Sequence, residues 1–319
     1  MTAFIIVCVI VAIGEIVRYL LLRNPHRERK WRFDRLKRVK GGTFDPNATE
    51  AGERRVMEIA GVEFAFRYCP PGEFLMGSPE DEPEREDVET QHKVVLTRGF
   101  WLMESPLTQK QWKAVAGFNP SKFKGENLPV ETISWNDCDK FVKTLNEKLS
   151  ELPEGWRFSL PTEAQWEYAC RAGTTTPFPW GNSLNGDNAN CDGNYPYGTE
   201  ETGTYLKKTT PVGSYWSNDW GLYDMCGNVY EWCLDYYGEY PKGEVVDPAR
   251  LDSGDEKDWD DDGNTVWEKG AGSDRVRRGG CWGSYAVYCR SAYRNWYDAD
   301  RRNYIALGAR LALVPTFSR

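Results

Sequence analysis

The residues best suited to chemistry lie together near the end of the chain. Within residues 275–313, Cys281 and Cys289 follow a pair of glycines, Gly279 and Gly280, in a run dense in tyrosine, tryptophan and arginine. Consecutive glycines permit positive φ or a close backbone approach, and the residues that follow lack the apolar period of a core helix. This pattern is typical of a binding or catalytic loop. The alternative is a terminal hairpin with one polar face.

The large side chains of this segment could form a ligand-binding face. Tyrosine, tryptophan and arginine offer large contact area for a small loss of side-chain entropy. The candidates are Tyr285, Tyr288, Tyr293, Trp296, Tyr297, Arg301 and Tyr304. The alternative is that part of this set packs over the core instead.

Composition excludes several kinds of site. The chain has 319 residues with nine cysteines and two histidines, His26 and His92, so a metal site built on several histidines is excluded. No CxxC pair occurs, which argues against zinc, and there is no P-loop, no GxGxxG after a strand and no GxSxG. We expect Cys138 and Cys170 to be small core side chains, because they stand among apolar residues.

The chain begins with an apolar segment at residues 3–22, which has the length of a helix that spans a bilayer, about 20 residues. Glu15 and Arg18 interrupt it, and at a spacing of three on a helix they can neutralise each other. No charged region precedes the segment and no small-x-small cleavage site follows it. We therefore predict an uncleaved single-pass membrane anchor rather than a signal peptide.

A basic segment and linker at residues 23–53 follow the anchor. Residues 23–40 hold nine basic and two acidic residues, which favours a cytoplasmic flank and a cytoplasmic domain; export is the alternative. An amphipathic helix on anionic lipid, with Trp31 and Phe33 in the interface, is another. Since the whole chain carries −8 and the flank +7, the part from Gly41 onward carries −15. That charge argues against nucleic-acid binding and suits calcium.

Short strands and three helices must position the tail. Apolar and alternating runs predict strands at residues 62–68, 70–78, 93–103 and 305–314. Thr108, Ser134 and Thr162 are expected to cap helices, the last of which ends at Gly173. We expect the acidic run 80–89 to be a solvated loop. Without a regular βαβ alternation, the pattern predicts a single α+β domain over residues 54–319.

Several motifs occur in the order found in a known family. They are PPGEFLMGS (70–78), PVETISWNDCDKF (129–141), LPTEAQWEYACRAG (160–173), FPWGN (178–182), GLYDMCGNVYEW (221–232) and RRGGCW (277–282), followed by CRSAYRN and GARLAL. Together they resemble the formylglycine-generating enzyme (sulfatase-modifying factor) family over most of the chain. The resemblance implies one domain with a C-type-lectin-like core, rich in loops and low in regular secondary structure.

Enzymes of that family use two cysteines, five residues apart, to bind copper(I), activate oxygen and convert a sulfatase cysteine to formylglycine. Such chemistry needs two thiolates that converge on one soft ion. Counted without gaps, the first catalytic cysteine falls at Ser284 and the second at Cys289, so the pair is broken. Cys281 and Cys289, eight apart, could still meet across a hairpin and bind copper. The alternative for Cys289 is a small buried residue.

The resemblance also implies structural calcium. The matching positions are Asp224, Gly227, Val229 and Glu231 for one ion, and Asn190 and Cys191 for a second. Carboxylate and carbonyl oxygens are the ligands of a hard cation, and Asp192 could replace an acidic ligand missing from the second site. The alternative is that Asp224 and Glu231 only cap and pair. Residues 258–264, DWDDDGN, resemble the opening of an EF-hand loop, but position twelve is Lys269, so we predict a solvated loop there.

Three functions are compatible with these patterns. We favour a membrane-anchored, calcium-stabilised domain that binds a protein or other ligand through its Tyr/Trp/Arg-rich C-terminal surface without catalysis. The tail also resembles the variable proteins of diversity-generating retroelements. The alternatives are a copper-dependent oxidase that activates sulfatases and a structural or signalling subunit that docks one fixed partner.

Overall fold

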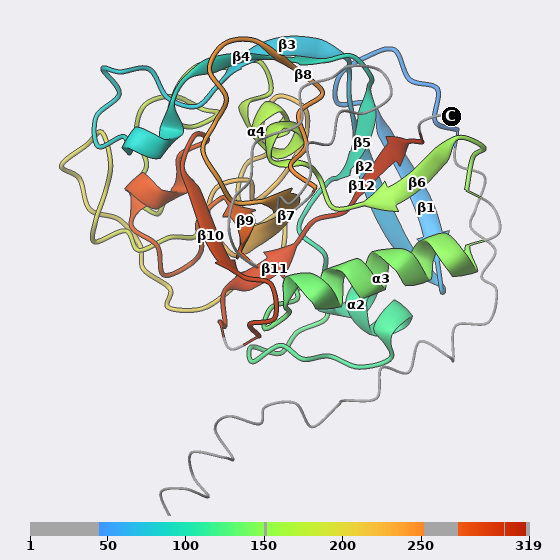
Figure 1. Ribbon diagram of the computed structural model, residues 1–319. Helices are drawn as coiled ribbons and strands as arrows, with labels where there is room; N and C mark the ends of the chain where they lie inside the picture. Colours follow the sequence, from blue (N-terminus) through green and yellow to red (C-terminus); the bar gives the residue numbers. More distant parts are fainter. Residues whose placement is uncertain (1–44, 150–151, 252–273, 303, 317–319) are drawn as a thin grey trace, which may run out of the picture.

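Three sheets and three α-helices make up the described part of the chain. The computed structural model describes residues 45–149, 152–251, 274–302 and 304–316 (Figure 1). The strands are β1 (Arg54–Ile59), β2 (Val62–Cys69), β3 (Gly72–Met76), β4 (His92–Leu96), β5 (Phe100–Met103), β6 (Trp156–Ser159), β7 (Tyr230–Tyr236), β8 (Val245–Val246), β9 (Asp274–Arg278), β10 (Arg294–Asp298), β11 (Leu307–Ala309) and β12 (Ala312–Pro315). The helices are α2 (Gln109–Ala116), α3 (Trp135–Lys148) and α4 (Glu163–Arg171), with 3-10 turns η2 (Asp87–Glu89) and η3 (Ala286–Cys289).

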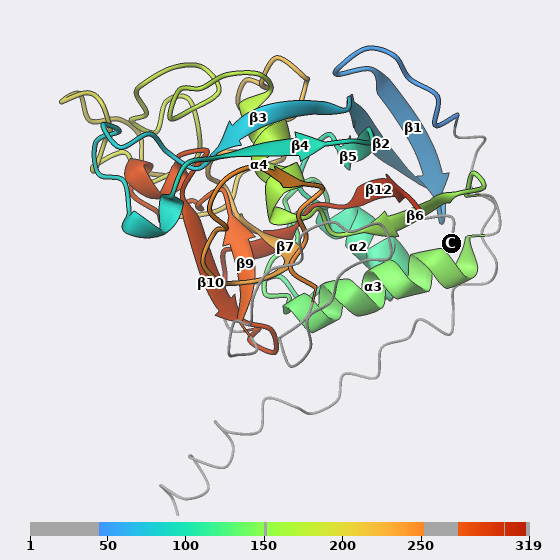
Figure 2. The same ribbon diagram turned by 45° about the horizontal axis from the view of Figure 1, so that its top comes forward.

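The sheets have the orders β1-β2-β5-β12-β6, β10-β9-β7-β11 and β3-β4-β8. In β2, Phe64 and Phe66 are buried while Ala65 between them is not, so the strand turns one face to the core. Helix α2 contacts β2 and helix α3 contacts β6, so both helices cover one face of the five-stranded sheet (Figure 2). The last strand, β12, lies between β5 and β6 and therefore closes this sheet with the end of the chain.

The three predicted helix starts are confirmed. Thr108, Ser134 and Thr162 are the N-caps, and each side chain accepts a hydrogen bond from the third helical N–H in a complete capping box. The last helix ends one residue earlier than predicted, because Ala172 already adopts a left-handed conformation with φ of 47°. Gly173 follows with φ of 92°.

Two predicted strands are in fact pairs of strands. Residues 93–103 divide into β4 and β5, which belong to different sheets. Residues 305–314 divide into β11 and β12 around Arg310, which is fully buried. Its guanidinium donates to the carbonyls of Met103 (2.8 Å) and Tyr223 (2.6 Å) and to the carboxylate of Glu231. Arg310, the charged residue in this apolar run, therefore forms hydrogen bonds with three segments that are distant in sequence.

Helix α4 lies between two of the sheets. It contacts β3 on one side and β7 and β9 on the other (Figures 1 and 2). Its buried residues include Glu163, Glu167 and Arg171 as well as Trp166. A helix that buries this many ionisable groups needs a partner for each of them.

The acidic run at residues 80–89 is not simply a solvated loop, and that prediction is wrong in part. Glu82 and Glu89 are buried, at 7% and 0% exposure. Both carboxylates pair with Arg290, at 2.8 Å for Glu89. Arg290 is itself fully buried, so the loop folds back over the C-terminal segment to neutralise it.

Arginines near the C-terminus repeat this arrangement. The buried ion pairs are Arg278–Glu163, Arg278–Glu167, Arg290–Glu82, Arg290–Glu89, Arg294–Glu163 and Arg310–Glu231. Glu167 also accepts from Arg171 and from the backbone N–H of Gly77. Four arginines of the tail are therefore structural rather than exposed.

Cysteine burial agrees with the sequence. All eight cysteines of the described residues are buried and unpaired by disulfides, which confirms Cys138 and Cys170 as core side chains. Within those same residues no helix is long and apolar enough to cross a bilayer. The anchor predicted at residues 3–22, and the basic segment as far as residue 44, lie outside them.

Replacing Glu167 tests how much the buried ion pairs contribute to the free energy of unfolding. Glu167→Gln would leave Arg278 and Arg171 buried with one negative charge fewer, so we expect a loss of about 3–5 kcal/mol in the free energy of unfolding. Urea denaturation followed by tryptophan fluorescence measures it. The control is Asp139→Asn, which breaks the surface pair with Lys143 and should cost less than about 1 kcal/mol. Equal losses in the two variants would contradict this account.

Candidate ligand-binding surface

Cys281 is a buried thiol directly after the glycine turn. Gly279 and Gly280 have φ of 91° and 69°, and the Sγ of Cys281 lies 3.3 Å from the Oγ of Ser284 and 3.8 Å from the hydroxyl of Tyr304. Burial raises the pKa of Cys281. The thiol therefore stays protonated at neutral pH, whereas metal ligation and nucleophilic attack need the thiolate.

Cys289 faces other partners. Its Sγ lies 3.8 Å from the carbonyl of Tyr285, and a hydrogen bond to the thiol of Cys191, followed by burial, raises its pKa well above the ordinary value. Ser284, where a count without gaps places the family's first catalytic cysteine, donates its hydroxyl to Tyr230 (3.3 Å). The thiols of Cys281 and Cys289 thus have different side-chain hydrogen-bond partners. A copper(I) site needs two converging thiolates, whereas burial keeps both of these thiols protonated.

Four tyrosines form a stacked column that runs from solvent to the interior. We call Tyr195, Tyr285, Tyr288 and Tyr293 the tyrosine column. Successive ring centroids are 3.9, 5.9 and 5.0 Å apart, and the first two contacts are stacked. Tyr195 is 51% exposed and Tyr285 40%, while Tyr293 is 5% exposed. The outer two rings are therefore open to a ligand and the inner two hold them in place.

A second cluster surrounds the guanidinium of Arg277. Its central carbon lies 4.3 Å from the ring of Tyr230, 4.9 Å from Tyr297 and 5.0 Å from Tyr304. We call these four residues the arginine cluster. Among the described residues, no carboxylate lies within salt-bridge distance of Arg277, so ring faces take the place of a counter-ion.

Asn295 joins the column to the cluster. Its amide nitrogen donates to the hydroxyl of Tyr293 (2.7 Å), and its amide oxygen accepts from Arg277 (3.3 Å). In the antiparallel pair of β9 and β10, Asn295 lies opposite Arg277. Residues opposite each other in a ladder share a face, so the sheet sets this contact.

Of the seven residues predicted to form the ligand-binding face, five belong to the tyrosine column or the arginine cluster. The other two, Trp296 and Arg301, lie apart from both. Trp296 is 47% exposed, but strand alternation turns it away from Asn295 and Tyr297, and its ring packs on Tyr237 at 6.3 Å. Arg301 is exposed in the connection that follows β10. The predicted face is therefore divided between the two sides of a strand.

Sequence reasoning missed Tyr195, Tyr230, Arg277 and Asn295 as members of this surface. Tyr195 lies in a long irregular loop, and nothing in its neighbourhood marks it. If the run RVRR is predicted to be a strand, the alternation of its side chains places Arg275 and Arg277 on one face. Tyr230 is nearly buried beneath the cluster, and only the pairing of β7 with β9 brings it there.

The first predicted calcium set is brought together only in part. Both oxygens of Glu231 are taken: Arg310 donates to each, and the indole N–H of Trp166 donates to Oε2 at 2.8 Å. Asp224 accepts the backbone N–H of Gly213 at 2.7 Å, and burial raises the pKa of Asp224 to about 6. The buried carboxylate of Asp224 fits a cation, whereas Glu231 is committed to its ion pair.

The second set lies against the first. The carbonyl of Asn190 accepts from the N–H of Asn228 (2.8 Å), and a Cβ on Gly227 would come within 2.5 Å of that same carbonyl oxygen. The Oδ1 of Asn190 is buried without a hydrogen-bond partner. The thiol of Cys191 forms a hydrogen bond with the thiol of Cys289. Over the described residues there is no group of three His, Cys, Asp or Glu able to hold a metal. The acidic loop at residues 258–264 lies outside them.

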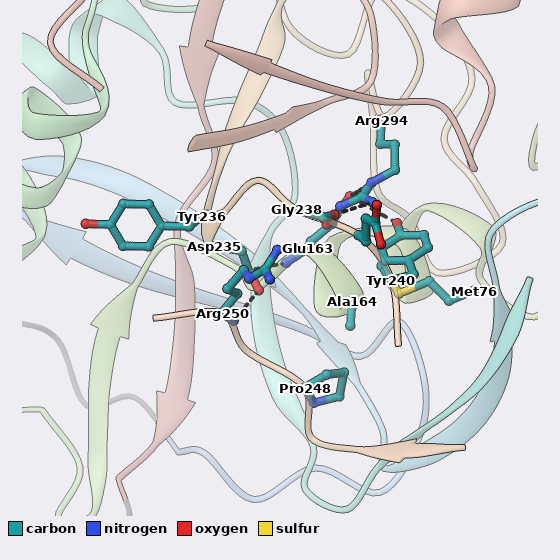
Figure 3. Close-up of a pocket in the computed structure, with 11 residues that line it drawn as sticks. Met76, Glu163, Ala164, Asp235, Tyr236, Gly238, Tyr240, Pro248, Arg250 and Arg294 are labelled. Atoms are coloured by element: carbon teal, nitrogen blue, oxygen red, sulfur yellow. Dashed lines mark hydrogen bonds and ion pairs between the residues drawn. The ribbon is translucent and has the colours of Figure 1, made fainter. Parts of the chain in front are cut away.

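A small pocket lies elsewhere and contains none of the sequence-predicted residues. Figure 3 shows its lining, in which Glu163 and Arg294 form an ion pair of 2.7 Å. Asp235 accepts the N–H groups of Glu163 (2.7 Å) and Arg250 (2.8 Å). Burial raises the pKa of Asp235 to about 7. These groups hold β7, α4 and the segment near Arg250 together.

The fold and this surface define a loop-rich α+β domain of the formylglycine-generating-enzyme type with an aromatic face. Residues 65–314 match the model of the sulfatase-modifying factor enzyme 1-like domain, so the chain belongs to that family. The resemblance stated from the motifs is thereby confirmed.

The chain is similar to curated proteins and to solved structures. The formylglycine-generating enzyme of Mus musculus is 31% identical over 206 residues, which cover 62% of this chain and 46% of the mouse protein, less than half its length. Among solved structures, Treponema denticola variable protein 1 is 25% identical with a TM-score of 0.65, covering 82% of this chain and 99% of its own. PvdO from Pseudomonas aeruginosa is 25% identical with a TM-score of 0.64, covering 83% and 99%.

Asp235 predicts a pH dependence of stability. Because its pKa rises from 3.8 unfolded to about 7 folded, the folded chain keeps a proton that the unfolded chain releases between these values. Its contribution to stability is complete below about pH 4 and lost as the pH rises through 7. The free energy of unfolding of the wild type, less that of Asp235→Asn, should fall over pH 4–7 and then level. A flat difference would contradict the buried, proton-holding carboxylate.

Proposed function

We propose that this chain is a membrane-anchored, non-catalytic member of its family that binds a protein or other ligand through the tyrosine column and the arginine cluster. The proposal depends on the contrast between the exposed tyrosines and the buried cysteines. The outer tyrosines are open to solvent, whereas the thiols that would do the chemistry are buried and protonated.

Pre-stacked aromatic rings suit recognition. Each tyrosine of the column is already held by its neighbour, so a ligand that contacts Tyr195 and Tyr285 orders little that was free before. The arginine cluster adds a cation that, among the described residues, faces aromatic rings and forms no ion pair. Such residue types dominate the energetics of protein interfaces.

The comparison with the Treponema denticola variable protein supports this proposal, because a protein named for its variability has the same fold over nearly its full length. We do not propose the activity of the mouse enzyme for this chain. Its chemistry in this family needs a cysteine at the position of Ser284, and the remaining thiols face other groups.

The apolar segment at residues 3–22 supports a single-pass anchor, and its basic flank supports a cytoplasmic position for the domain. In this arrangement the aromatic surface would meet cytoplasmic ligands close to the membrane. Reduced cysteines agree with such a compartment.

A binding selection tests the recognition surface. We expect a displayed peptide library, panned on the full-length chain in detergent, to yield binders whose affinity falls roughly 5- to 30-fold in Tyr285→Ala and Tyr288→Ala. Trp296→Ala is the matched control, because that exposed ring lies on the other face of β10. Binders equally sensitive to Trp296→Ala, or no binders at all, would contradict the proposed surface.

The same preparation separates recognition from catalysis. With copper(I), oxygen and a cysteine-containing sulfatase peptide, the reduced chain should form no aldehyde and bind no stoichiometric copper. Tight one-to-one copper binding, lost in Cys281→Ser and Cys289→Ser, together with aldehyde formation would instead establish the oxidase. Mass spectrometry of the peptide gives the readout.

We also propose that calcium stabilises the domain through Asp224. A cation beside this buried carboxylate would offset the cost of burying its charge. Millimolar calcium should raise Tm by roughly 2–4 °C for each kcal/mol of binding free energy, and Asp224→Asn should abolish the rise. If chelation by EDTA leaves the Tm of the wild type unchanged, calcium has no structural role here.

A further inference from the structure

A second cavity, far from Cys281 and Cys289 in sequence, has three aromatic walls. It is lined by Pro179, Trp180, Asn188, Ala189, Tyr215, Trp216, Asn218, Leu222, Asp224, Met225 and Cys226. Two irregular loops supply these residues, one around Trp180 and one around Trp216. None of the tyrosine column or arginine cluster belongs to it, and neither does Gly227, Val229 or Glu231 of the predicted calcium set.

The aromatic walls differ in how firmly they are held. The indole N–H of Trp180 donates to the carbonyl of Ser183 (3.0 Å), and its ring stacks on Phe178 with centroids 5.6 Å apart and planes 8° apart. Trp216 is 86% exposed, far more than Trp180 at 37%. One wall is thus fixed, and the other is almost fully exposed to water.

The lining carries one charged side chain. Asp224 is the only acid in the cavity wall, and no lysine, arginine or histidine lines it. One of its oxygens accepts the N–H of Gly213. Asn218 has no spare capacity, since its amide donates to the carbonyls of Ala169 and Cys170 and accepts from two backbone N–H groups. The site therefore presents negative charge and π faces together.

We propose that this cavity binds an organic ammonium group. Ring faces attract a cation through their quadrupole, and a carboxylate at the base of an aromatic enclosure neutralises it. The enclosed part of the space, about 10 Å³, holds no more than one water-sized group, so the ammonium group binds at the mouth of the cavity, where Trp216 is exposed. Trp180 forms the fixed wall, Trp216 covers the cation from the solvent side, and Asp224 pairs with it. The acidic charge of the body attracts such ligands from a distance.

Calorimetric titration of the full-length chain with choline tests the proposal. Its neutral isostere 3,3-dimethylbutan-1-ol is the ligand control. We expect saturable choline binding with Kd on the order of 1 mM and no binding of the isostere. Trp216→Ala should weaken choline binding roughly 2- to 30-fold, and Asp224→Asn should weaken it too. Trp296→Ala, which removes an exposed indole elsewhere, should leave it unchanged.

Each remaining outcome decides a point. Equal binding of choline and its isostere, or of neither, overturns the proposal. Because Asp224 belongs to both proposed sites, calcium that weakens choline binding supports the assignment, and calcium binding without choline binding overturns it. A lysine-containing peptide that binds more tightly than choline identifies the source as a protein side chain, and the reverse order identifies a small amine. None of these results depends on the tyrosine column.

Discussion

Buried pairs between C-terminal arginines and distant glutamates hold this fold together. The pairs of Arg310 with Glu231 and of Arg290 with Glu82 join positions 79 and 208 residues apart. Removing both charges from water costs several kcal/mol per ion, so such a pair persists only where further hydrogen bonds complete each guanidinium. Backbone carbonyls do so here: Met103 and Tyr223 for Arg310, and Glu84 for Arg290. Since few other arrangements satisfy all these groups, the tail has one place in the fold.

The position of the binding surface follows from that constraint. On β9 and β10, Arg278 and Arg294 point to α4 and its glutamate Glu163, so strand alternation turns Arg277 and Asn295 to the other face. The ion pairs on the opposite face hold β9 and β10 in place, and so they also fix the rings that pack beside Arg277 and Asn295. A surface built in this way can change its exposed residues without disturbing the core, because different side chains of the same strands carry the two tasks.

The sequence predicted local features better than distant pairings. Capping residues reveal helix starts because their hydrogen bonds lie within four residues, and Thr108, Ser134 and Thr162 all cap as expected. The family fold was also recognisable from ordered motifs. Charge was misleading, because an acidic run looks solvated and an arginine-rich tail looks exposed unless their mutual pairing is known. Likewise Tyr195 joins the column through a contact 90 residues away in sequence, for which no local pattern exists.

Burial that stabilises the tail also decides what chemistry remains there. Cys281 and Cys289 are as deeply enclosed as the arginines, and for Cys281 the cost of burying a thiolate outweighs the attraction of Arg277, so burial keeps both thiols protonated. A redox site would need the opposite balance, with exposed thiols in a positive environment. What this scaffold offers to solvent is ring faces, which lie over a guanidinium among tyrosines and beside the buried carboxylate of Asp224. Groups of this kind suit the recognition of charge and shape, which is the role that we propose for them.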